Sequence, residues 1–296
     1  MLKLPDVAGE YRFGYNLSPL TWFKVGGPAE VFFKPLNSND LANFIVQNQQ
    51  KMPVTVLGAG SNTIIRDGGI EGIVVKLGQN FTDISVVNDH EIDVGSGCLN
   101  FNLAKFCQEN SIAGFEFLIG IPGTIGGGIV MNAGAYGSEF KDNVVAVEAI
   151  DPKGNFLTLA NEEIGFRYRG NSLPQDLIIT KVKFKFTLGN KDRITEMMEE
   201  INKKRLETQP IKERTGGSTF ANPEDHKAWQ LIDQAGMRGY QIGGASMSQL
   251  HCNFMINNGS ATAKDLETLG DLVKRKVFEN SGVNLEWEIK RIGKYA

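Results

Sequence analysis

Hydrophobic and polar positions alternate along the first third of the chain in short blocks, a pattern typical of mixed α and β structure. Apolar runs predict buried strands at residues 31–33, 54–57 and 73–75. A helix is expected to begin near Ser38. Residues 84–94 predict a hairpin that turns at Asn88 and Asp89.

The middle of the chain predicts an antiparallel layer and a helix that covers it. Residues 99–109 have the spacing of a helix with one apolar face. Residues 144–159 predict a second hairpin, and residues 181–186 alternate lysine with apolar side chains. These strands favour an antiparallel sheet.

The composition of the chain changes near Gly189, which is a plausible domain joint. A charged helix is expected at residues 192–207 and a shorter one at 225–235. A long helix with a buried stripe should run from Thr262 to Gly282. The last predicted strand covers residues 285–289.

Composition and charge exclude several classes of protein. The chain carries 31 basic and 34 acidic side chains with a net charge of -3, which gives no electrostatic footprint for nucleic acid or an anionic membrane. Its three cysteines form no C-x-x-C pair, so neither a disulfide framework nor a metal site is suggested. The first residues lack the apolar core of a signal peptide. A cytoplasmic location fits best.

One segment resembles a membrane span only in its length. Residues 117–138 contain no charged side chain and are long enough to cross a bilayer. They also hold seven glycines, Pro122 and Asn132, which leave too little aliphatic surface for insertion. We therefore expect no membrane span.

Two short glycine loops are candidates for phosphate binding, because glycine lets backbone N–H groups approach a phosphate closely. Residues 58–62 and 95–97 each lack the third glycine of G-x-G-x-x-G, since Thr63 and Asn100 stand in its place. Taken alone, either loop is also compatible with a plain tight turn.

A third glycine-rich segment carries more weight. In regular structure, each glycine of residues 119–128 costs about 0.5–1 kcal/mol relative to alanine, so a ligand or another backbone should lie close by. Residues 132–137 add an amide, small side chains and an aromatic ring, which suit a flat heteroaromatic cofactor. A structural hairpin corner is the alternative.

Eight motifs occur in order along nearly the whole chain. They are residues 21–28 (TWFKVGGP), 57–62 (LGAGSN), 120–127 (GIPGTIGG), 132–137 (NAGAYG), 166–169 (FRYR), 217–223 (GSTFANP), 251–254 (HCNF) and 285–289 (LEWEI). Together they resemble the bacterial UDP-N-acetylenolpyruvoylglucosamine reductases. The short route from Arg169 to Ser218 is similar to the compact branch of that family.

The resemblance implies an α+β fold with two parts. The first is an FAD-binding domain of the vanillyl-alcohol-oxidase type, with subdomains at residues 1–75 and 76–189. The second is a C-terminal α+β substrate-binding domain at residues 190–296. NADPH would reduce the flavin, which would pass hydride to the enolpyruvyl group of a UDP-sugar and give UDP-N-acetylmuramate for peptidoglycan. No nucleic acid, membrane or obligate protein partner is expected.

The resemblance also implies roles for individual residues. Arg169 and Glu288 would stabilise the enolate, and Ser218 would deliver the proton. The residues implied for FAD binding are Thr21, Gly58, Ala59, Gly60, Ser61, Asn62, Ile121, Pro122, Gly123, Thr124, Gly126, Gly127, Asn132, Ala133, Gly134 and Ala135. The candidates for substrate binding are Tyr168, Lys212, Arg214 and Asn222. Because residues 21–62 hold no histidine or cysteine, the FAD is expected to be non-covalent.

Residue types alone leave other interpretations open. Arg169 could be a surface arginine, Glu288 could lie on the wet face of an edge strand, and Ser218 could be a turn serine. For the whole protein, the alternatives are an FAD oxidase of the same fold and a non-catalytic module that binds a nucleotide sugar.

Overall fold

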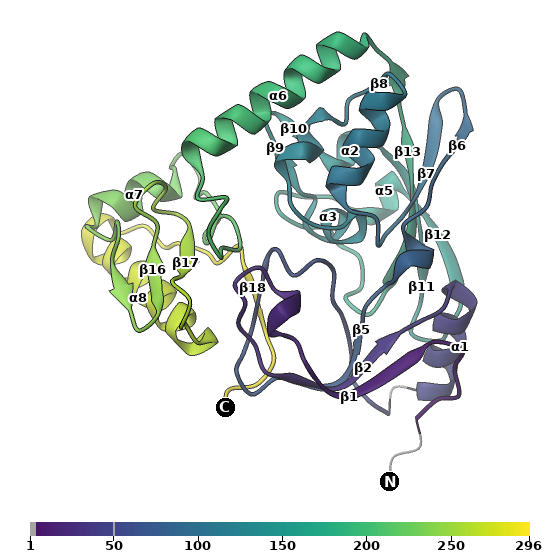
Figure 1. The fold of residues 1–296 in the computed structure, drawn as a ribbon, viewed down its shortest axis with the longest axis horizontal. Helices are drawn as coiled ribbons and strands as arrows, with labels where there is room; N and C mark the ends of the chain where they lie inside the picture. Colours follow the sequence, from purple (N-terminus) through teal and green to yellow (C-terminus); the bar gives the residue numbers. More distant parts are fainter. Residues whose placement is uncertain (1–3, 50) are drawn as a thin grey trace. The chain divides into compact units, whose positions relative to one another are not determined.

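The computed structural model describes residues 4–49 and 51–296 (Figure 1). The chain divides into two compact units, each built from several stretches of sequence. Unit 1 comprises the described residues of Met1–Phe13, Val31–Ala59 and Gly72–Lys203. Unit 2 comprises Gly14–Glu30, Gly60–Glu71 and Lys204–Ala296.

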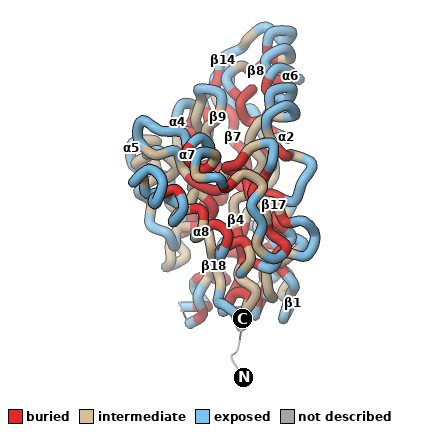
Figure 2. Tube along the Cα trace, turned by 90° about the vertical axis from the view of Figure 1, so that its left-hand side faces the viewer, coloured by how far each residue is buried: buried red, intermediate tan, exposed pale blue. Residues whose placement is uncertain are grey.

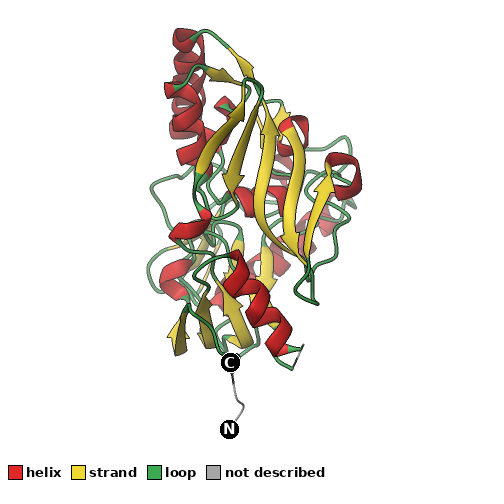
Figure 3. Cartoon of the chain, turned by 90° about the vertical axis from the view of Figure 1, so that its right-hand side faces the viewer, coloured by secondary structure: helices red, strands yellow, loops and turns green. Residues whose placement is uncertain are grey.

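A five-stranded antiparallel sheet forms the centre of unit 1. Its strands, in spatial order, are β12 (Phe156–Ala160), β11 (Val144–Ile150), β13 (Ile178–Lys185), β7 (Glu91–Gly95) and β6 (Ile84–Asn88). They are among the long arrows of Figure 3. The antiparallel layer and both predicted hairpins are confirmed.

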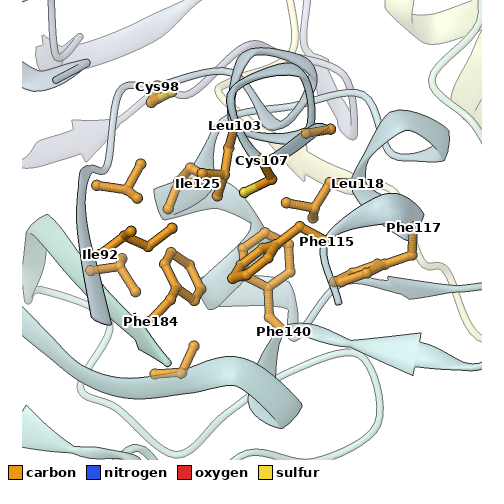
Figure 4. Packing of buried hydrophobic residues seen from close by; sticks show 14 of the residues in the cluster. Ile92, Cys98, Leu103, Cys107, Phe115, Phe117, Leu118, Ile125, Phe140 and Phe184 are labelled. Atoms are coloured by element: carbon orange, nitrogen blue, oxygen red, sulfur yellow. The ribbon is translucent and has the colours of Figure 1, made fainter. Parts of the chain in front are cut away.

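Helices α2 (Asn100–Glu109) and α3 (Ile125–Met131) supply apolar side chains to the core beside this sheet. Phe115 and Phe184 meet edge to face with ring centroids 5.6 Å apart, and Phe140 lies close to Phe184 (Figure 4). The core is therefore closed by aromatic rings, and the glycine-rich segment lies directly on it.

A second sheet has the strand order β1 (Glu10–Asn16), β2 (Pro28–Lys34), β5 (Ile70–Val75) and β3 (Val54–Val56). Helix α1 (Ser38–Asn48) begins as predicted near Ser38, because the side chain of Asn37 accepts a hydrogen bond from the N–H of Asp40. Its Phe44 packs on Phe33 of β2 with ring centroids 4.6 Å apart.

Unit 2 contains a three-stranded sheet and two helices. The sheet has the order β15 (Gln241–Ile242), β16 (Ala245–Met247) and β17 (Met255–Asn257). The helices are α7 (Ala228–Gln234) and α8 (Ala263–Ser281). As predicted, Thr262 caps the start of α8 and Gly282, with φ +71°, ends it.

The remaining elements are shorter, apart from one helix. They are β4 (Thr63–Ile65), β8 (Ile112–Ala113), β9 (Gly134–Ala135), β10 (Ser138–Glu139), β14 (Thr187–Leu188), β18 (Lys290–Ile292), α4 (Phe140–Asn143), α5 (Asn161–Ile164), α6 (Lys191–Thr208) and the 3-10 turns at Ser18–Leu20, Gln79–Phe81 and Glu116–Gly120. The long helix is α6, which matches the predicted charged helix. Figure 2 shows it mainly exposed, in line with its three buried residues, Ile194, Met198 and Ile201.

Two sequence predictions need correction. The strand predicted at residues 285–289 is wrong: this segment forms a single bridge, between Trp287 and Phe220, and the regular strand β18 begins at Lys290. The helix predicted at 225–235 is shorter than expected, because only residues 228–234 are helical and form α7. The chain before them is irregular, and the side chain of Asn222 accepts a hydrogen bond from the N–H of Ala228 at the start of the helix. Among the described residues, no helix is long and apolar enough to cross a membrane.

A buried ion pair fastens the last strand of unit 2. The side chain of Glu267 on α8 is 6 % exposed, and both of its oxygens lie 3.1 Å from Nε of Arg66. Arg291 of β18 approaches the same carboxylate at 3.9 Å. Because β4 and β18 pair in parallel, this carboxylate holds both strands beside α8.

We expect Glu267→Ala to lower the free energy of unfolding by about 2–3 kcal/mol, because it removes charge-assisted hydrogen bonds from a buried site. Arg66 is 23 % exposed and can regain some water, which keeps the loss below that of a fully buried pair. Urea titrations monitored by circular dichroism measure this change in the free energy of unfolding. Glu279→Ala, on the exposed part of the same helix, is the matched control and should leave the midpoint nearly unchanged. Equal effects of the two variants would contradict this assignment.

Candidate functional site

The first glycine loop follows β3 and lies against the third glycine-rich segment. A Cβ on Gly58 would lie 2.9 Å from Oγ1 of Thr124, closer than real Cβ contacts allow. Nζ of Lys76 donates a hydrogen bond to the carbonyl oxygen of Gly58 at 2.6 Å. Burial, and then the nearby Lys34 charge, lower the pKa of Lys76. Unit 1 thus places two predicted cofactor segments side by side, and Lys76 is a residue that the sequence analysis missed.

The second glycine loop supports the start of α3. Oγ1 of Thr124 accepts a hydrogen bond from the N–H of Gly127 at 3.3 Å. The N–H groups of Ile125 and Gly126 donate to the carbonyls of Cys98 and Ser96, each at 2.8 Å. The N–H groups of residues 95–97 donate to the carbonyls of Asp83, Thr180 and Phe81, so this loop has no free backbone donor for a phosphate.

The loop after β3 retains free donors that fit a phosphate-bearing cofactor. Within the described part of the chain, the backbone N–H groups of Gly58, Ala59 and Gly60 have no protein acceptor. Gly60 has φ +64°, a conformation that favours glycine. Successive free N–H groups in such a turn suit an anion. The residues present therefore fit the diphosphate of FAD.

Two residues predicted to bind FAD, Thr21 and Asn132, have side chains with no exposed surface. Thr21 is fully buried, and its Oγ1 accepts a hydrogen bond from the N–H of Val25 and lies 2.9 Å from the carbonyl oxygen of Val25. Asn132 is also fully buried and bonds to other parts of unit 1. In unit 2, Nδ2 of Asn62 donates to the carbonyl of Glu288 at 3.1 Å. Their predicted contacts with FAD stay predictions.

Arg169 lies at the corner of a tight turn in unit 1. The N–H of Arg167 donates to the carbonyl of Gly170 at 2.9 Å, and the N–H of Gly170 donates back at 3.2 Å. Arg169 itself has φ +55°, which is uncommon for a residue other than glycine. Its guanidinium carbon lies 4.9 Å from the centre of the exposed Tyr168 ring. The turn therefore fixes the backbone of the predicted arginine.

Ser218 and Glu288 lie on neighbouring backbone segments of unit 2. Ser218 forms an antiparallel bridge with Phe254. The next residue, Thr219, accepts a hydrogen bond at its carbonyl from the N–H of Glu288 at 2.9 Å. Both Ser218 and Glu288 are half-buried. The structure thus brings together two of the three predicted catalytic residues, while Arg169 belongs to unit 1.

Asn253 forms hydrogen bonds to the two residues that follow Ser218. No role was predicted for it from the sequence. Its side-chain oxygen accepts from the N–H of Phe220 at 3.0 Å, and its Nδ2 donates to the Phe220 carbonyl at 2.9 Å. Its own carbonyl accepts from the N–H of Thr219 at 2.7 Å. The signal was present in the sequence, because Asn253 belongs to the motif at residues 251–254.

The predicted substrate-binding residues differ in their surroundings. Lys212 lines a cavity of about 560 Å³ in unit 2, together with polar groups such as Gln209, Ser246 and Ser248. Arg214 is exposed and pairs through its backbone with Asn257. The side-chain oxygen of Asn222 is already used by the N–H of Ala228. Lys212 is therefore the candidate best placed to meet a ligand.

Burial disfavours the charged forms of the three cysteine thiols and of the His251 imidazole by shifting their pKa values. Burial raises the pKa of Cys98 to about 11 and also raises that of Cys107. Burial and the charge of Arg238 lower the pKa of His251. Nδ1 of His251 accepts from the N–H of Asn253 at 3.3 Å, which requires the neutral ring. In the described ranges, no three His, Cys, Asp or Glu side chains gather as metal ligands.

Comparison with known protein families defines the class of this protein. An FAD binding domain matches residues 29–160, which include the glycine segments of unit 1. The C-terminal domain of UDP-N-acetylenolpyruvoylglucosamine reductase matches residues 209–292, which include Ser218 and Glu288. The fold and the site are thus those of a flavin-dependent reductase.

Comparison with whole chains specifies the family. The UDP-N-acetylenolpyruvoylglucosamine reductases of Rickettsia peacockii and Rickettsia felis are 70 % and 69 % identical over 295 residues, which is 100 % of both chains. The crystal structure of this reductase from Thermus caldophilus matches with a TM-score of 0.84 and 33 % identity, over 97 % of this chain and 100 % of that one. The chain belongs to the UDP-N-acetylenolpyruvoylglucosamine reductase family.

The predicted family, fold class and reaction are confirmed by these matches. The chain is an FAD-dependent oxidoreductase of peptidoglycan precursor synthesis, and this family uses NADPH as the reductant. The comparisons favour this reductase over both alternatives, the oxidase of the same fold and the non-catalytic binding module.

The buried, neutral His251 gives a testable pH dependence. Its folded pKa lies below the ordinary value of 6.5, so the unfolded chain takes up the proton first as the pH falls. The free energy of unfolding should therefore decline below about pH 6.5 and keep declining until the folded pKa is reached. Between about pH 7.5 and 5.5, the free energy of unfolding of His251→Gln, measured in urea titrations, should decline less than that of the parent. His90→Gln, at an exposed site, is the control that should keep the full decline. A decline of equal size in His251→Gln would exclude this cause.

Proposed function

We propose that this reductase converts UDP-N-acetylglucosamine enolpyruvate to UDP-N-acetylmuramate with Ser218 as the proton donor and with Arg169 and Glu288 as the groups that stabilise the enolate. The observation that carries the proposal is the pairing of the Ser218 and Glu288 segments through the hydrogen bond from the Glu288 N–H to the Thr219 carbonyl. FAD, when bound and reduced by NADPH, supplies the hydride to the enolpyruvyl double bond.

Hydride addition to one carbon of the double bond leaves a pair of electrons on the other carbon. This carbanion is conjugated with the substrate carboxylate, so negative charge develops on its oxygens. Ser218 would give its hydroxyl proton to the carbon and regain a proton from water. Serine is a weak acid, so it needs a fixed position close to the carbanion. The backbone bonds of Thr219 and Phe220 to Asn253 supply that rigidity.

Arg169 and Glu288 would act on the developing charge. The guanidinium of Arg169 offers several donors to the substrate carboxylate and remains positively charged throughout. Glu288 can donate a hydrogen bond to the enolate only in its protonated form. Both groups would stabilise the transition state more than the substrate, because the extra charge is present only there.

We propose that FAD is held without a covalent bond by the loop Gly58, Ala59, Gly60, Ser61 and Asn62 and by the segments that contain Thr21, Ile121, Pro122, Gly123, Thr124, Gly126, Gly127, Asn132, Ala133, Gly134 and Ala135. The free N–H groups of Gly58, Ala59 and Gly60 support this assignment. The close approach of Gly58 to Thr124 gives a second reason, since it joins the two segments in unit 1.

The UDP group of the substrate would be bound by residues of the C-terminal part of the chain. Lys212 lines the cavity of unit 2 and can meet a phosphate there. Arg214 adds a second cation in the same loop, and Asn222 completes the C-terminal set. Tyr168, which belongs to unit 1, is the one proposed substrate-binding residue outside it. The functional division into residues 1–75, 76–189 and 190–296 also remains a proposal.

We place the enzyme in the cytoplasm, acting on a small molecule without an obligate protein partner, nucleic acid or membrane. The family is cytoplasmic, and the three cysteines of this chain are buried as free thiols, which suits a reducing compartment.

Acid precipitation of the purified enzyme should release all the flavin as free FAD. Residues 21–62 hold no histidine or cysteine to form a covalent bond, and the three cysteines of the chain are buried thiols. Absorbance of supernatant and pellet measures the partition. Yellow colour that stays with the precipitated protein would contradict the non-covalent assignment.

The role of Ser218 is tested by Ser218→Ala in anaerobic stopped-flow experiments. The variant should bind FAD and accept hydride from NADPH at close to the normal rate. Reoxidation by the enolpyruvyl UDP-sugar should then slow by about 10²–10⁴-fold, the range for general acid catalysis. Ser218→Cys should recover part of the rate, because a thiol can also give a proton. Ser85→Ala, on the exposed edge strand β6 of unit 1, is the control for loss of a hydroxyl in a segment that carries no proposed site residue. If Ser218→Ala reoxidises within about threefold of the parent, Ser218 is not the acid.

A further inference from the structure

We infer that Asn132 is a positioning residue, whose side chain holds the Arg169 turn in place for substrate reduction. This role of the side chain differs from the flavin contact that the sequence predicts for the same residue, and it leaves only the backbone of Asn132 for that contact. The inference rests on the proposed role of Arg169, and it concerns contacts that lie wholly within unit 1.

The amide of Asn132 is enclosed by protein and fully used. The residue has no exposed surface. Its Nδ2 donates to the carbonyl of Arg167 at 3.1 Å and to the carboxylate of Glu139. Its Oδ1 accepts from the N–H of Lys141 at 3.1 Å. Because both donors and the acceptor have protein partners, the side chain has no polar group left to offer a cofactor.

The carbonyl that Asn132 holds belongs to the turn of Arg169. The same oxygen of Arg167 also accepts the N–H of Gly170 at 3.2 Å, the bond that closes the turn. Arg169 lies between these residues in the left-handed region, with φ +55°. A non-glycine residue persists there only where the surroundings determine its conformation. The bond from Asn132 is one such constraint.

A second amide links the same two segments in the opposite direction. Asn171, which follows the turn, donates from Nδ2 to the carbonyls of Ile129 and Val130 at 3.1 and 3.2 Å. These carbonyls lie in the last turn of α3, whose C-cap is Asn132 itself. The two asparagines therefore clamp the Arg169 turn to the end of the helix that begins in the glycine-rich segment.

This clamp couples the position of Arg169 to the glycine-rich helix. If α3 lies at the flavin, as proposed above, the distance from the flavin to the Arg169 turn is set by seven helical residues and two amides. Misplacement of a catalytic group by about 1 Å can cost about 10²-fold in rate. Loss of the clamp should therefore slow the step that uses Arg169 while the flavin remains bound.

The test variant is Asn132→Gly. Asn132 has φ +39°, which glycine adopts readily and alanine does not, so this change removes the amide without straining the backbone. In the holoenzyme, we expect the affinity for FAD and the rate of reduction by NADPH to stay within about threefold of the parent. Reoxidation by the enolpyruvyl UDP-sugar should slow by about 10–100-fold.

Asn48→Ala is the matched control. Asn48 is 5 % exposed and also uses its amide within unit 1, where it bonds to the backbone of Met52. Within the described part of the chain, its amide forms no hydrogen bond to the Arg169 turn or to α3. Loss of this buried amide should leave both half-reactions unchanged. A variant Asn132→Gly that reoxidises within threefold of the parent, or that only weakens FAD binding, would overturn the inference.

A double-variant cycle separates the inference from the proposed function. Asn132→Gly added to Arg169→Ala should slow reoxidation by less than about twofold more, because the clamp acts only through the arginine. Full additivity would overturn the inference and leave the role of Arg169 intact. If Arg169→Ala alone reoxidises at the parent rate, the proposed role of Arg169 fails and the inference fails with it.

Asn171→Ala tests the clamp from its other side. This variant leaves Asn132 and the end of α3 unchanged, so it provides the answer even where Asn132→Gly does not fold. As in Asn132→Gly, the rate of flavin reduction by NADPH should stay normal and reoxidation by the UDP-sugar should slow. Added to Arg169→Ala, the change should not slow reoxidation further. Normal reoxidation in Asn171→Ala, with FAD bound, would contradict a clamp made by the two amides.

Discussion

The hydrogen bond from the N–H of Glu288 to the carbonyl of Thr219 is the contact on which the proposed chemistry of unit 2 depends. It sets two irregular segments side by side, and neither is part of a regular sheet at that point. Irregular backbone needs side-chain support, because its polar groups have few regular partners. Asn253 provides it for Thr219 and Phe220. The buried Glu267 provides it for the strand that follows Glu288.

In unit 1, glycine allows one backbone segment to approach another segment closely. At Gly58 a side chain would collide with Thr124, and at Gly126 a Cβ would lie 3.0 Å from that of Ser96. Glycine here removes bulk rather than adding flexibility. The N–H groups that stay free lie in the loop after β3, while those at the start of α3 are already bonded to protein. The backbone N–H groups of the two glycine-rich segments thus differ: those of Gly58 and Ala59 remain available for the proposed ligand, and those at the start of α3 are used within the protein.

Much of the fold could be predicted from periodicity, and much of the site from its motifs. The stripe of α8, its Thr262 cap and the two hairpins follow local rules, so sequence spacing was sufficient. The segment 285–289 alternates like a strand, yet it pairs with a loop, and such long-range pairing leaves no trace in local pattern. The burial of Asn132 was equally hidden, because an asparagine beside glycines has the same appearance in a cofactor loop and in a helix cap.

The parallel pair β4 and β18 has a consequence for how the enzyme is made. Asn62 and Glu288 are in contact although 226 positions separate them in the sequence. On the ribosome, residues 62–65 wait without their partner strand until β18 has been synthesised and has left the exit tunnel. The glycine-rich helix α3 and the Arg169 turn need no such delay, because all segments of unit 1 precede residue 204. The nascent chain can therefore complete the contacts of unit 1 first, and the pairing of the Ser218 and Glu288 segments is among the last contacts to form during synthesis.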